Sequence, residues 1–327
     1  MSLTEKAAAF AATAGNILVP ESARTGLRAT TKRLGAFDYP FALECHLADA
    51  AGRVDLTVRI HPELRDAILK NRFVISDAVT HFLKKWADPN GPLAAIPYLE
   101  LEFDINGEVC DPWFGPAVEP FVARGPSGIY REARKRPELR AQRVTLSKHV
   151  LANLPVTPPT NALLNRLALA YDALPALGSI NHIGALAARR SAPKEGIRLI
   201  LSLPRYALAT YLADVGWQGD LERLDRELDG LKPLTERVDL DLYLDNASAG
   251  DTMAIYNEYR APRKANSALA KTLERLRSMG YLDASQKEAV ANWIAAVDGD
   301  SSRVLTFKLS WQKDAPTIAK LYLSQLR

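Results

Sequence analysis

Residues 237–245 read Arg-Val-Asp-Leu-Asp-Leu-Tyr-Leu-Asp, so every second side chain is apolar and the side chains between them are polar. Successive side chains of a β-strand point to opposite faces of a sheet, so a period of two is typical of a strand with one buried face. The apolar face carries Val238, Leu240, Leu242 and Leu244. The other face carries carboxylates, an arginine and a tyrosine, which suits a wet cavity. This stretch therefore predicts a strand that separates a packed core from a polar space.

The same alternation recurs along the chain in paired short segments. The expected strands are 41–47, 54–60, 98–105, 113–118, 182–188, 197–203, 237–245, 253–259, 304–311 and 318–323. Each of the first four pairs is followed by two segments with helical patterning, among them 77–86 after a capping Ser76 and 285–297 after a capping-box spacing at Ser285. Strands joined by short turns pair antiparallel.

About ten antiparallel strands with helices over one face can close into a barrel, which removes the edges of the sheet. We therefore predict an α+β fold, with about ten antiparallel strands closed into a barrel that has a polar lumen and is surrounded by helices. Residues 1–36 are expected to form an N-terminal helical segment that packs on the barrel. Residues 37–327 are expected to form a single antiparallel αββα barrel domain, because no Pro-, Ser- or Gly-rich linker divides them.

Composition excludes several classes of protein. The net charge of +4 is spread along the chain, so no region concentrates the positive charge that nucleic acid requires. Cys45 and Cys110 are the two cysteines, which suggests a reducing compartment and no disulfide framework. No apolar run approaches the ~20 residues of a membrane span, and the N-terminus lacks the pattern of a signal peptide. We expect a cytoplasmic protein; the sequence does not indicate its oligomeric state.

The order of elements and the polarity of the strands resemble the ABBA prenyltransferases, over about residues 41–326. Residues 40–44 are similar to the first strand of the fungal indole branch, where a glutamate serves as base near the acceptor. Residues 58–62 resemble its second strand, where an arginine binds diphosphate shortly before a proline. Lys320-Leu321-Tyr322 is similar to the Lys-x-Tyr strands that clamp diphosphate. The resemblance implies a lumen that holds an isoprenyl diphosphate and an aromatic or peptide acceptor.

Cations and tyrosines on the polar faces are the candidates for diphosphate binding, because phosphate chemistry needs several donors that converge from different strands. They are Arg59, Arg198, Lys308, Lys320, Tyr243, Tyr256 and Tyr322. We expect Arg59, Lys308 and Lys320 to converge, since the second, ninth and tenth strands are neighbours around a closed barrel. Glu44 and His46 share one face of the first strand, and a carboxylate beside an imidazole could accept a proton from the acceptor.

Acidic residues on other strands leave an alternative open. Diphosphate-binding barrels usually carry cations and tyrosines where this chain has Glu100, Glu102, Asp239 and Asp241. These acids could hold Mg²⁺ against a diphosphate, although no cofactor or metal site is certain from the sequence. They could equally bind a cationic small molecule or peptide, in a barrel that is non-catalytic or catalyses another reaction. An α+β interaction protein, with its polar face in solvent, is the third interpretation.

Several motifs favour structural roles. His61, His81, His149 and His182 lack the spacing of metal ligands, so we expect ordinary structural histidines. Trp113, next to Phe114, Gly115 and Pro116, is expected at an edge bulge or at a rim that meets the acceptor. The leading interpretation is a prenyltransferase-like enzyme that transfers an isoprenyl group from a diphosphate donor to an aromatic or peptide acceptor inside the barrel.

Overall fold

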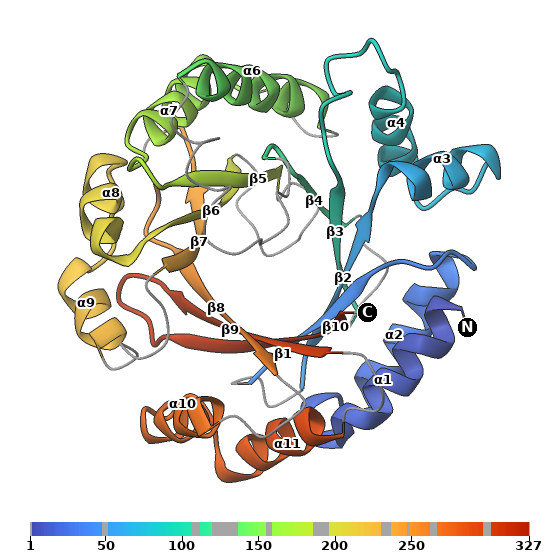
Figure 1. Cartoon of the computed structure of the whole chain (residues 1–327), viewed down its shortest axis with the longest axis vertical. Helices are drawn as coiled ribbons and strands as arrows, with labels where there is room; N and C mark the ends of the chain where they lie inside the picture. The colour runs from blue at the N-terminus through green and yellow to red at the C-terminus, as the bar shows by residue number, and fades with distance from the viewer. Residues whose placement is uncertain are drawn as a thin grey trace.

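A computed structural model describes residues 2–47, 52–105, 112–119, 137–154, 159–185, 196–229, 237–246, 249–261, 267–296 and 302–326. Ten strands form a closed ring in these parts of the chain, and helices surround it on the outside (Figure 1). The strands are β1 (Phe41–His46), β2 (Val54–Ile60), β3 (Leu99–Asp104), β4 (Trp113–Pro116), β5 (Ser179–Ala185), β6 (Ile197–Pro204), β7 (Arg237–Leu244), β8 (Met253–Ala261), β9 (Ser302–Trp311) and β10 (Ile318–Leu326).

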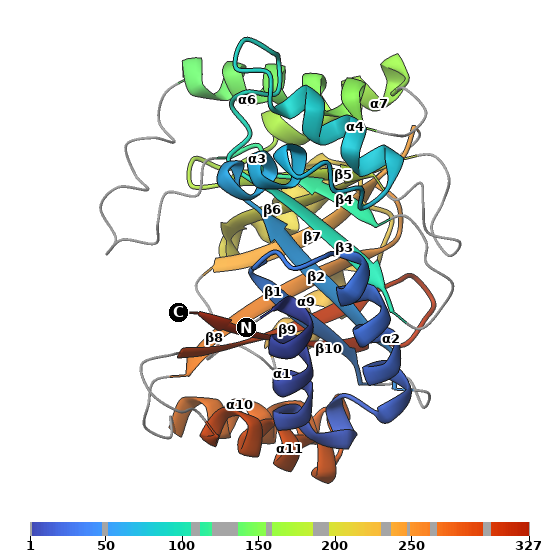
Figure 2. The ribbon, with the colours of Figure 1, turned by 90° about the vertical axis from the view of Figure 1, so that its right-hand side faces the viewer.

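The described helices lie outside the ring in consecutive pairs, as the side view also shows (Figure 2). They are α1 (Leu3–Leu18), α2 (Glu21–Arg33), α3 (Pro62–Lys70), α4 (Asp77–Trp86), α6 (Pro137–Asn153), α7 (Asn161–Asp172), α8 (Leu208–Asp214), α9 (Leu221–Asp229), α10 (Ser267–Ser278) and α11 (Ala284–Ala295). Within these described elements, no helix has both the length and the apolar character needed to cross a bilayer.

Every strand pairs antiparallel with its neighbours, and β1 pairs with β10 to close the ring. Closure satisfies the backbone groups that an open sheet would leave at its edges. The predicted α+β barrel with antiparallel strands, surrounded by helices, is therefore confirmed. The N-terminal helices lie against it: Phe10 of α1 makes edge-to-face contacts with Phe41 of β1 and Trp293 of α11.

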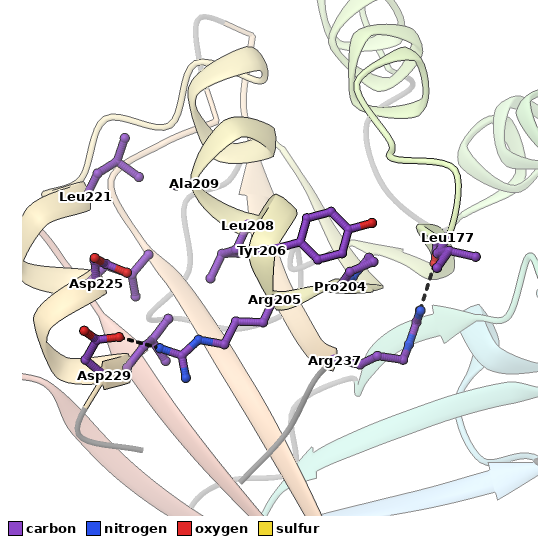
Figure 3. A pocket seen from close by; sticks show the side chains of 12 residues that line it. Leu177, Pro204, Arg205, Tyr206, Leu208, Ala209, Leu221, Asp225, Asp229 and Arg237 are labelled. Atoms are coloured by element: carbon purple, nitrogen blue, oxygen red, sulfur yellow. Dashed lines mark hydrogen bonds and ion pairs between the residues drawn. The ribbon is translucent and has the colours of Figure 1, made fainter. Parts of the chain in front are cut away.

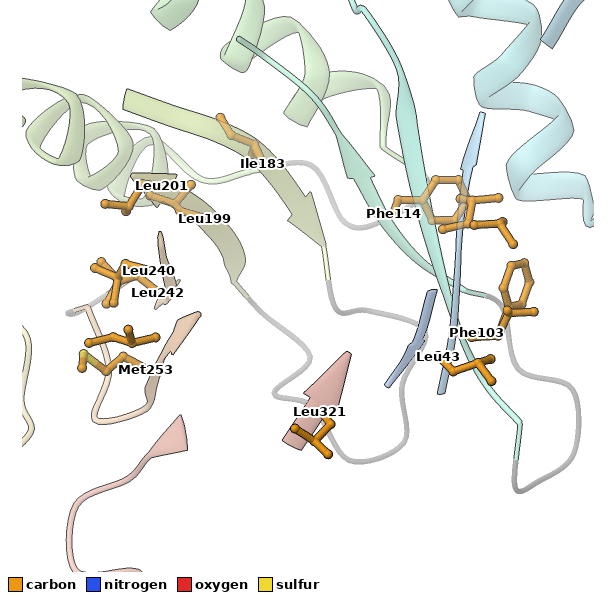
Figure 4. Close-up of a cluster of buried hydrophobic side chains, with 14 of the residues drawn as sticks. Leu43, Phe103, Phe114, Ile183, Leu199, Leu201, Leu240, Leu242, Met253 and Leu321 are labelled. Atoms are coloured by element: carbon orange, nitrogen blue, oxygen red, sulfur yellow. The ribbon is translucent and has the colours of Figure 1, made fainter. Parts of the chain in front are cut away.

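The hydrophobic core lies between the outer face of the barrel and the helices. The alternate apolar residues of each strand point outward and are buried, and Figure 4 shows part of this layer, with Leu199 and Leu201 of β6 near Leu240 and Leu242 of β7. Burying a leucine side chain contributes roughly 2 kcal/mol, so the period of two is fixed by many such residues at once. A shift of one residue would expose this layer and bury the charges instead. The polar residues consequently face the lumen.

Three local predictions differ from the structure. The strand expected at 182–188 begins at Ser179, and its pairing with β6 contains an irregularity between Ile180 and His182. The capping box of α11 starts from Asp283, whose carboxylate accepts from the amide of Gln286, so the helix starts earlier than the Ser285 cap predicted. Part of the helix expected at 129–153 is α6; residues 129–136 lie outside the described residues.

Candidate active site

Asp241 of β7 lies at the centre of a polar cluster in the described lumen. Its Oδ1 accepts from Arg198 Nε at 2.7 Å, and its Oδ2 lies 2.6 Å from Arg198 Nη2 and 3.0 Å from Lys308 Nζ. The Tyr256 hydroxyl donates to the same oxygen at 2.9 Å. Burial alone would raise the pKa of Asp241, but Arg198 and Lys308 hold that pKa well below its usual range. Two cations and a hydroxyl on one carboxylate form a rigid, charge-compensated unit.

Arg198 reaches across the lumen from β6 to β3. Its Nη1 lies 3.1 Å from Glu102 Oε2, and its guanidinium stacks 4.4 Å from the ring of Trp113. Gly184 pairs with Arg198 across the sheet and leaves room for the Trp113 ring. A Cβ at Gly184 would lie only 2.3 Å from Trp113 Cζ2. A second donor, Nη2, also contacts the Tyr256 hydroxyl at 2.7 Å. The arginine is therefore fixed from four sides, and each nitrogen of its guanidinium already contacts a protein group.

Glu44 of β1 connects this cluster to the neighbouring strand β10. The Tyr322 hydroxyl donates to Glu44 Oε2 at 2.5 Å, and Lys320 Nζ lies 2.7 Å from Oε1. The Glu44 side chain is fully buried, which would raise its pKa, but Lys320, Lys308 and His46 hold the pKa well below its usual range. Tyr322 lies 5.7 Å from the ring of Tyr256, so the two polar units meet through a pair of aromatic rings.

His46 and Asp55 form a second acidic unit beside Glu44. His46 Nε2 lies 3.0 Å from Asp55 Oδ2 and 4.0 Å from Glu44 Oε1. Arg53 donates from Nε to Asp55 Oδ1 at 3.3 Å, and its Nη2 lies 3.0 Å from Asp104. The Asp55 side chain is fully buried, whereas His46 keeps 11% of its side-chain surface exposed. The histidine is therefore the accessible member of this unit.

Arg59 of β2 lies beside the start of β1, in a group with Glu100 and His182 that Arg198 also influences. Its Nη2 and Nε donate to Glu100 Oε1 at 2.6 and 3.1 Å, and its guanidinium lies 4.4 Å from the ring of Tyr98. Arg59 hydrogen-bonds through its backbone to Pro40, whereas Lys320 pairs with His46. Six residues of strand, about 20 Å, separate these positions. The register thus sets Arg59 apart from Lys320 along β1, and the arginine that shares a carboxylate with Lys308 is Arg198.

Two further candidates lie on the lumen side of β7. Tyr243 pairs across the sheet with Arg198, and its hydroxyl lies so close to Gly196 that a Cβ there would be 2.0 Å away. Asp239 pairs with Ser202 and Tyr256. Both side chains are half-buried. Their position beside the Asp241 cluster suits the wall of a ligand space.

The acids that could hold Mg²⁺ according to the sequence are not the ones that the structure gathers into a group of potential ligands. Within the described residues, a group with three potential ligands is formed by Glu44, His46 and Asp55, whose donor atoms lie within 4.8 Å of one another. Lys320 and Arg53 contact its two carboxylates, so protein cations already compensate their charge. The acids proposed for Mg²⁺ from the sequence were Glu100, Glu102, Asp239 and Asp241. Three of these four contact arginines or a lysine.

Sequence reasoning missed three residues of the lumen. Asp55 belongs to the alternating strand expected at 54–60 but was not among the predicted site residues. His182, expected to be structural, lies in β5 with Nε2 3.6 Å from Glu100 Oε2; burial and neighbouring arginines lower the pKa of His182 although Glu100 opposes this. Trp113, expected at an edge or rim, lies buried beneath Arg198. The signal for Asp55 was available, since it occupies the same parity as Arg59.

A pocket of about 720 Å³ lies away from this network, between α8, α9 and the ends of β6 and β7 (Figure 3). Five of its twelve lining residues are leucines, and two others, Arg205 and Asp229, pair with each other at 3.0 Å. Arg237 donates to the carbonyl of Leu177 at 3.0 Å on another side. Its charged lining residues are Arg205, Arg237, Asp225 and Asp229, whereas the lumen brings two cations onto one buried carboxylate. The lumen is therefore the better candidate for chemistry.

Comparisons with known proteins give the same fold. No family model matches the sequence, and no curated protein sequence matches it. The apo crystal structure of prenyltransferase PriB matches with a TM-score of 0.58 and 14% identity, over 99% of this chain and 96% of that one. The 5-dimethylallyl tryptophan synthase of Streptomyces coelicolor, solved with DMASPP and Trp, matches with a TM-score of 0.58 and 14% identity, over 99% and 95%.

AnaPT from Neosartorya fischeri has a TM-score of 0.58 and 10% identity, over 95% of this chain and 91% of that one. At these identities the likeness is one of fold. The chain therefore has the barrel of the ABBA prenyltransferases, and the resemblance drawn from the order of its elements is confirmed at that level.

Proposed function

We propose that this protein transfers an isoprenyl group from a diphosphate donor to an aromatic acceptor inside its barrel. Two independent lines support the proposal. The fold is that of aromatic prenyltransferases, among which PriB has been crystallised with L-tryptophan and dimethylallyl thiolodiphosphate. The lumen also carries the residue types that this chemistry needs.

The observation that carries the proposal is the connected cluster of Arg198, Lys308, Lys320, Tyr256 and Tyr322. These residues come from β6, β8, β9 and β10, and contacts through Asp241 and Glu44 hold them in one part of the lumen. When the carbon–oxygen bond of the donor breaks, negative charge develops on the leaving diphosphate. Fixed cations and hydroxyls stabilise that charge. The tyrosine rings can stabilise the allylic cation that forms beside them.

Carboxylates hold these cations in place and also compete with a ligand for them. Arg198 contacts Glu102 and Asp241, Lys308 contacts Asp241, and Lys320 contacts Glu44. A diphosphate must therefore share or displace these contacts. This predicts modest affinity for the free diphosphate and tighter binding when Mg²⁺ accompanies it, because the metal brings compensating charge.

The alternative, a barrel that binds a cationic ligand through its acids, receives less support. Glu100, Glu102 and Asp241 each contact an arginine or lysine of the protein itself. A cationic ligand would have to displace these side chains and leave them buried without a partner, which is costly.

Thermal unfolding with isoprenyl diphosphates tests the proposal. Dimethylallyl, geranyl and farnesyl diphosphate, each with and without Mg²⁺, should raise the melting temperature by mass action. Mass spectrometry then follows transfer to L-tryptophan, indole and a tryptophan-containing peptide. Lys308→Ala should weaken donor binding about ten- to a hundredfold, because a hydrogen bond to a charged group is worth about 1.5–3 kcal/mol.

Lys313→Ala is the matched control, since this lysine is exposed between β9 and β10 and should leave binding unchanged. The proposal fails if the wild-type protein binds none of the three donors at millimolar concentration under either condition. A shift produced by polyamines instead of diphosphates would favour the cationic-ligand alternative.

A further inference from the structure

His46 lies in the lumen at a position from which it could take the ring proton of the aromatic acceptor. It is the last residue of β1, and its lumen-facing side chain pairs across the sheet with Lys320, which pairs in turn with Lys308. Directly opposed residues of antiparallel strands have Cβ atoms about 4.5–5.5 Å apart. The imidazole is therefore one strand away from Lys320 and two strands away from Lys308, the lysines proposed to hold the leaving group. The base that takes the ring proton must lie within a few ångströms of the ring carbon that forms the new bond. His46 lies beside Lys320, one of the lysines that would hold the donor, so it is close to that carbon.

Asp55 fixes the state of this imidazole. Its Oδ2 lies 3.0 Å from His46 Nε2, and the carboxylate is itself held by Arg53 and fully buried. A carboxylate accepts hydrogen bonds, so the pair favours the tautomer with the proton on Nε2. The other ring nitrogen, Nδ1, then carries a lone pair. Within the described chain, no group hydrogen-bonds to Nδ1, and the side chain retains exposed surface.

Glu44, the base suggested by its place on the first strand, is less suited to this task. Its side chain is fully buried, Tyr322 donates to one oxygen, and Lys320 lies against the other. An acceptor could reach it only if one of these partners moved away. Its contacts suit a different role, in which the carboxylate holds Lys320 and Tyr322 in position.

We infer that His46 removes the ring proton of the acceptor and that Asp55 is a positioning residue for it. The inference rests on the proposed prenyl transfer. The donor carbon–oxygen bond breaks, and its electron pair leaves with the diphosphate. An electron pair of the aromatic ring forms the new bond to the allylic carbon. The ring carbon–hydrogen bond then breaks, its electrons restore aromaticity, the proton goes to His46 Nδ1, and the imidazolium later releases it to water.

Kinetics with dimethylallyl diphosphate and ring-deuterated L-tryptophan or indole tests this assignment. His46→Gln should lower kcat for transfer by about a hundredfold, in the range typical of general bases. Binding of inorganic diphosphate and hydrolysis of the donor should be retained, because neither step uses the base. A primary deuterium isotope effect on kcat should also appear, since ring deprotonation becomes slow. Asp55→Asn should show the same pattern more weakly, and Asp55→Glu should recover part of the rate.

His149→Gln is the matched control, because His149 is exposed on α6. If the wild-type protein transfers the prenyl group and His46→Gln transfers it at the same rate, the inference is wrong and the proposed function stands. So would an isotope effect that appears in Glu44→Gln and not in His46→Gln. Absence of any transfer by the wild-type protein would overturn the proposed function, and the inference with it.

The tautomer gives a readout that needs no acceptor. Long-range ¹H–¹⁵N spectra of the five histidines, assigned with His46→Gln, should show His46 protonated on Nε2 with Nδ1 bare. Asp55→Asn should weaken that preference. A proton on Nδ1 in the wild-type protein would overturn the assignment. A divalent metal bound through His46 in the purified protein would overturn it too, because the imidazole would then serve as a ligand.

Discussion

Replacing Asp241 by asparagine would keep the shape of the side chain and remove the charge that Arg198 and Lys308 share. The carboxylate receives contacts from both cations and from the Tyr256 hydroxyl, at 2.6–3.0 Å. We expect two opposite effects of this one change. The free protein should lose stability, and its affinity for a diphosphate should rise, because the cations lose the carboxylate that competes with the ligand.

The sizes of both effects follow from burial. Removing one partner of a buried ion pair costs about 3–5 kcal/mol, and Asp241 has a side chain only 12% exposed. Asparagine still offers one accepting oxygen, so the expected loss is about 3 kcal/mol, at the lower end. A charge-assisted hydrogen bond returned to the ligand is worth about 1.5–3 kcal/mol, or roughly ten- to a hundredfold in affinity.

Urea unfolding followed by tryptophan fluorescence measures the first effect, and calorimetry with inorganic diphosphate measures the second. Asp229→Asn is the matched control, because Asp229 pairs with Arg205 at the surface with a side chain 46% exposed. Its loss should cost at most about 1 kcal/mol. The reasoning is refuted if Asp241→Asn costs no more than Asp229→Asn, or if diphosphate binds it no more tightly than wild type.

Three further outcomes are expected. Gly184→Ala should destabilise the protein by about 1–3 kcal/mol in urea unfolding, because the new methyl group would lie 2.3 Å from Trp113; a smaller loss would mean that the indole can move. Asp283→Ala should lower the free energy of unfolding by about 1 kcal/mol, because Asp283 caps α11, and Ser285→Ala should lower it clearly less. The reverse order would mean that Ser285 is the cap. The pKa of Glu44 is lowered in the folded state, so its stabilisation is present above the ordinary carboxyl value of about 4.3 and is lost as pH falls below it. Between pH 6 and pH 3, the free energy of unfolding of Glu44→Gln should therefore fall less steeply than that of the wild-type protein. Equal slopes in the two proteins would contradict this.

The alternation of residues was enough to predict the barrel, because each strand separates two environments. Leu240 and Leu242 lie under the helices while Asp239 and Asp241 face inward, and no other register satisfies both sets. The number of such strands and their short turns then favoured closure. The strands and their closure into a barrel depend on local residue patterns, which can be read from the sequence.

The partners across the lumen could not be predicted in the same way. Arg198 meets Glu102 although β6 and β3 are not adjacent, and that contact depends on the stagger of the strands around the barrel. The same stagger places Arg59 beside Pro40 and away from Lys320. Stagger is a property of the closed ring as a whole, so no single strand encodes it.

His182 was expected to be structural because it lacks the spacing of metal ligands, and β5, in which it lies, breaks the period of two. Ile180 and Ile183 are both buried, three residues apart, with the pairing irregularity between Ile180 and His182. A bulge changes which face later side chains occupy, so parity counted from the start of the strand fails. Trp113 was misplaced because the space for its ring depends on Gly184, on another strand.

Closure of the barrel by β1 and β10 has a consequence for synthesis of the chain. Glu44 and Tyr322 are 278 residues apart, so on the ribosome β1 has β2 as a neighbour long before β10 emerges. Until then its other edge is open, and an unpaired strand edge is a template for aggregation. Pairings of such long sequence separation also form slowly. The nascent chain should therefore depend on chaperones or low growth temperature until residues 318–326 are released, and the carboxylate of Glu44 should be among the last groups to find its native partners.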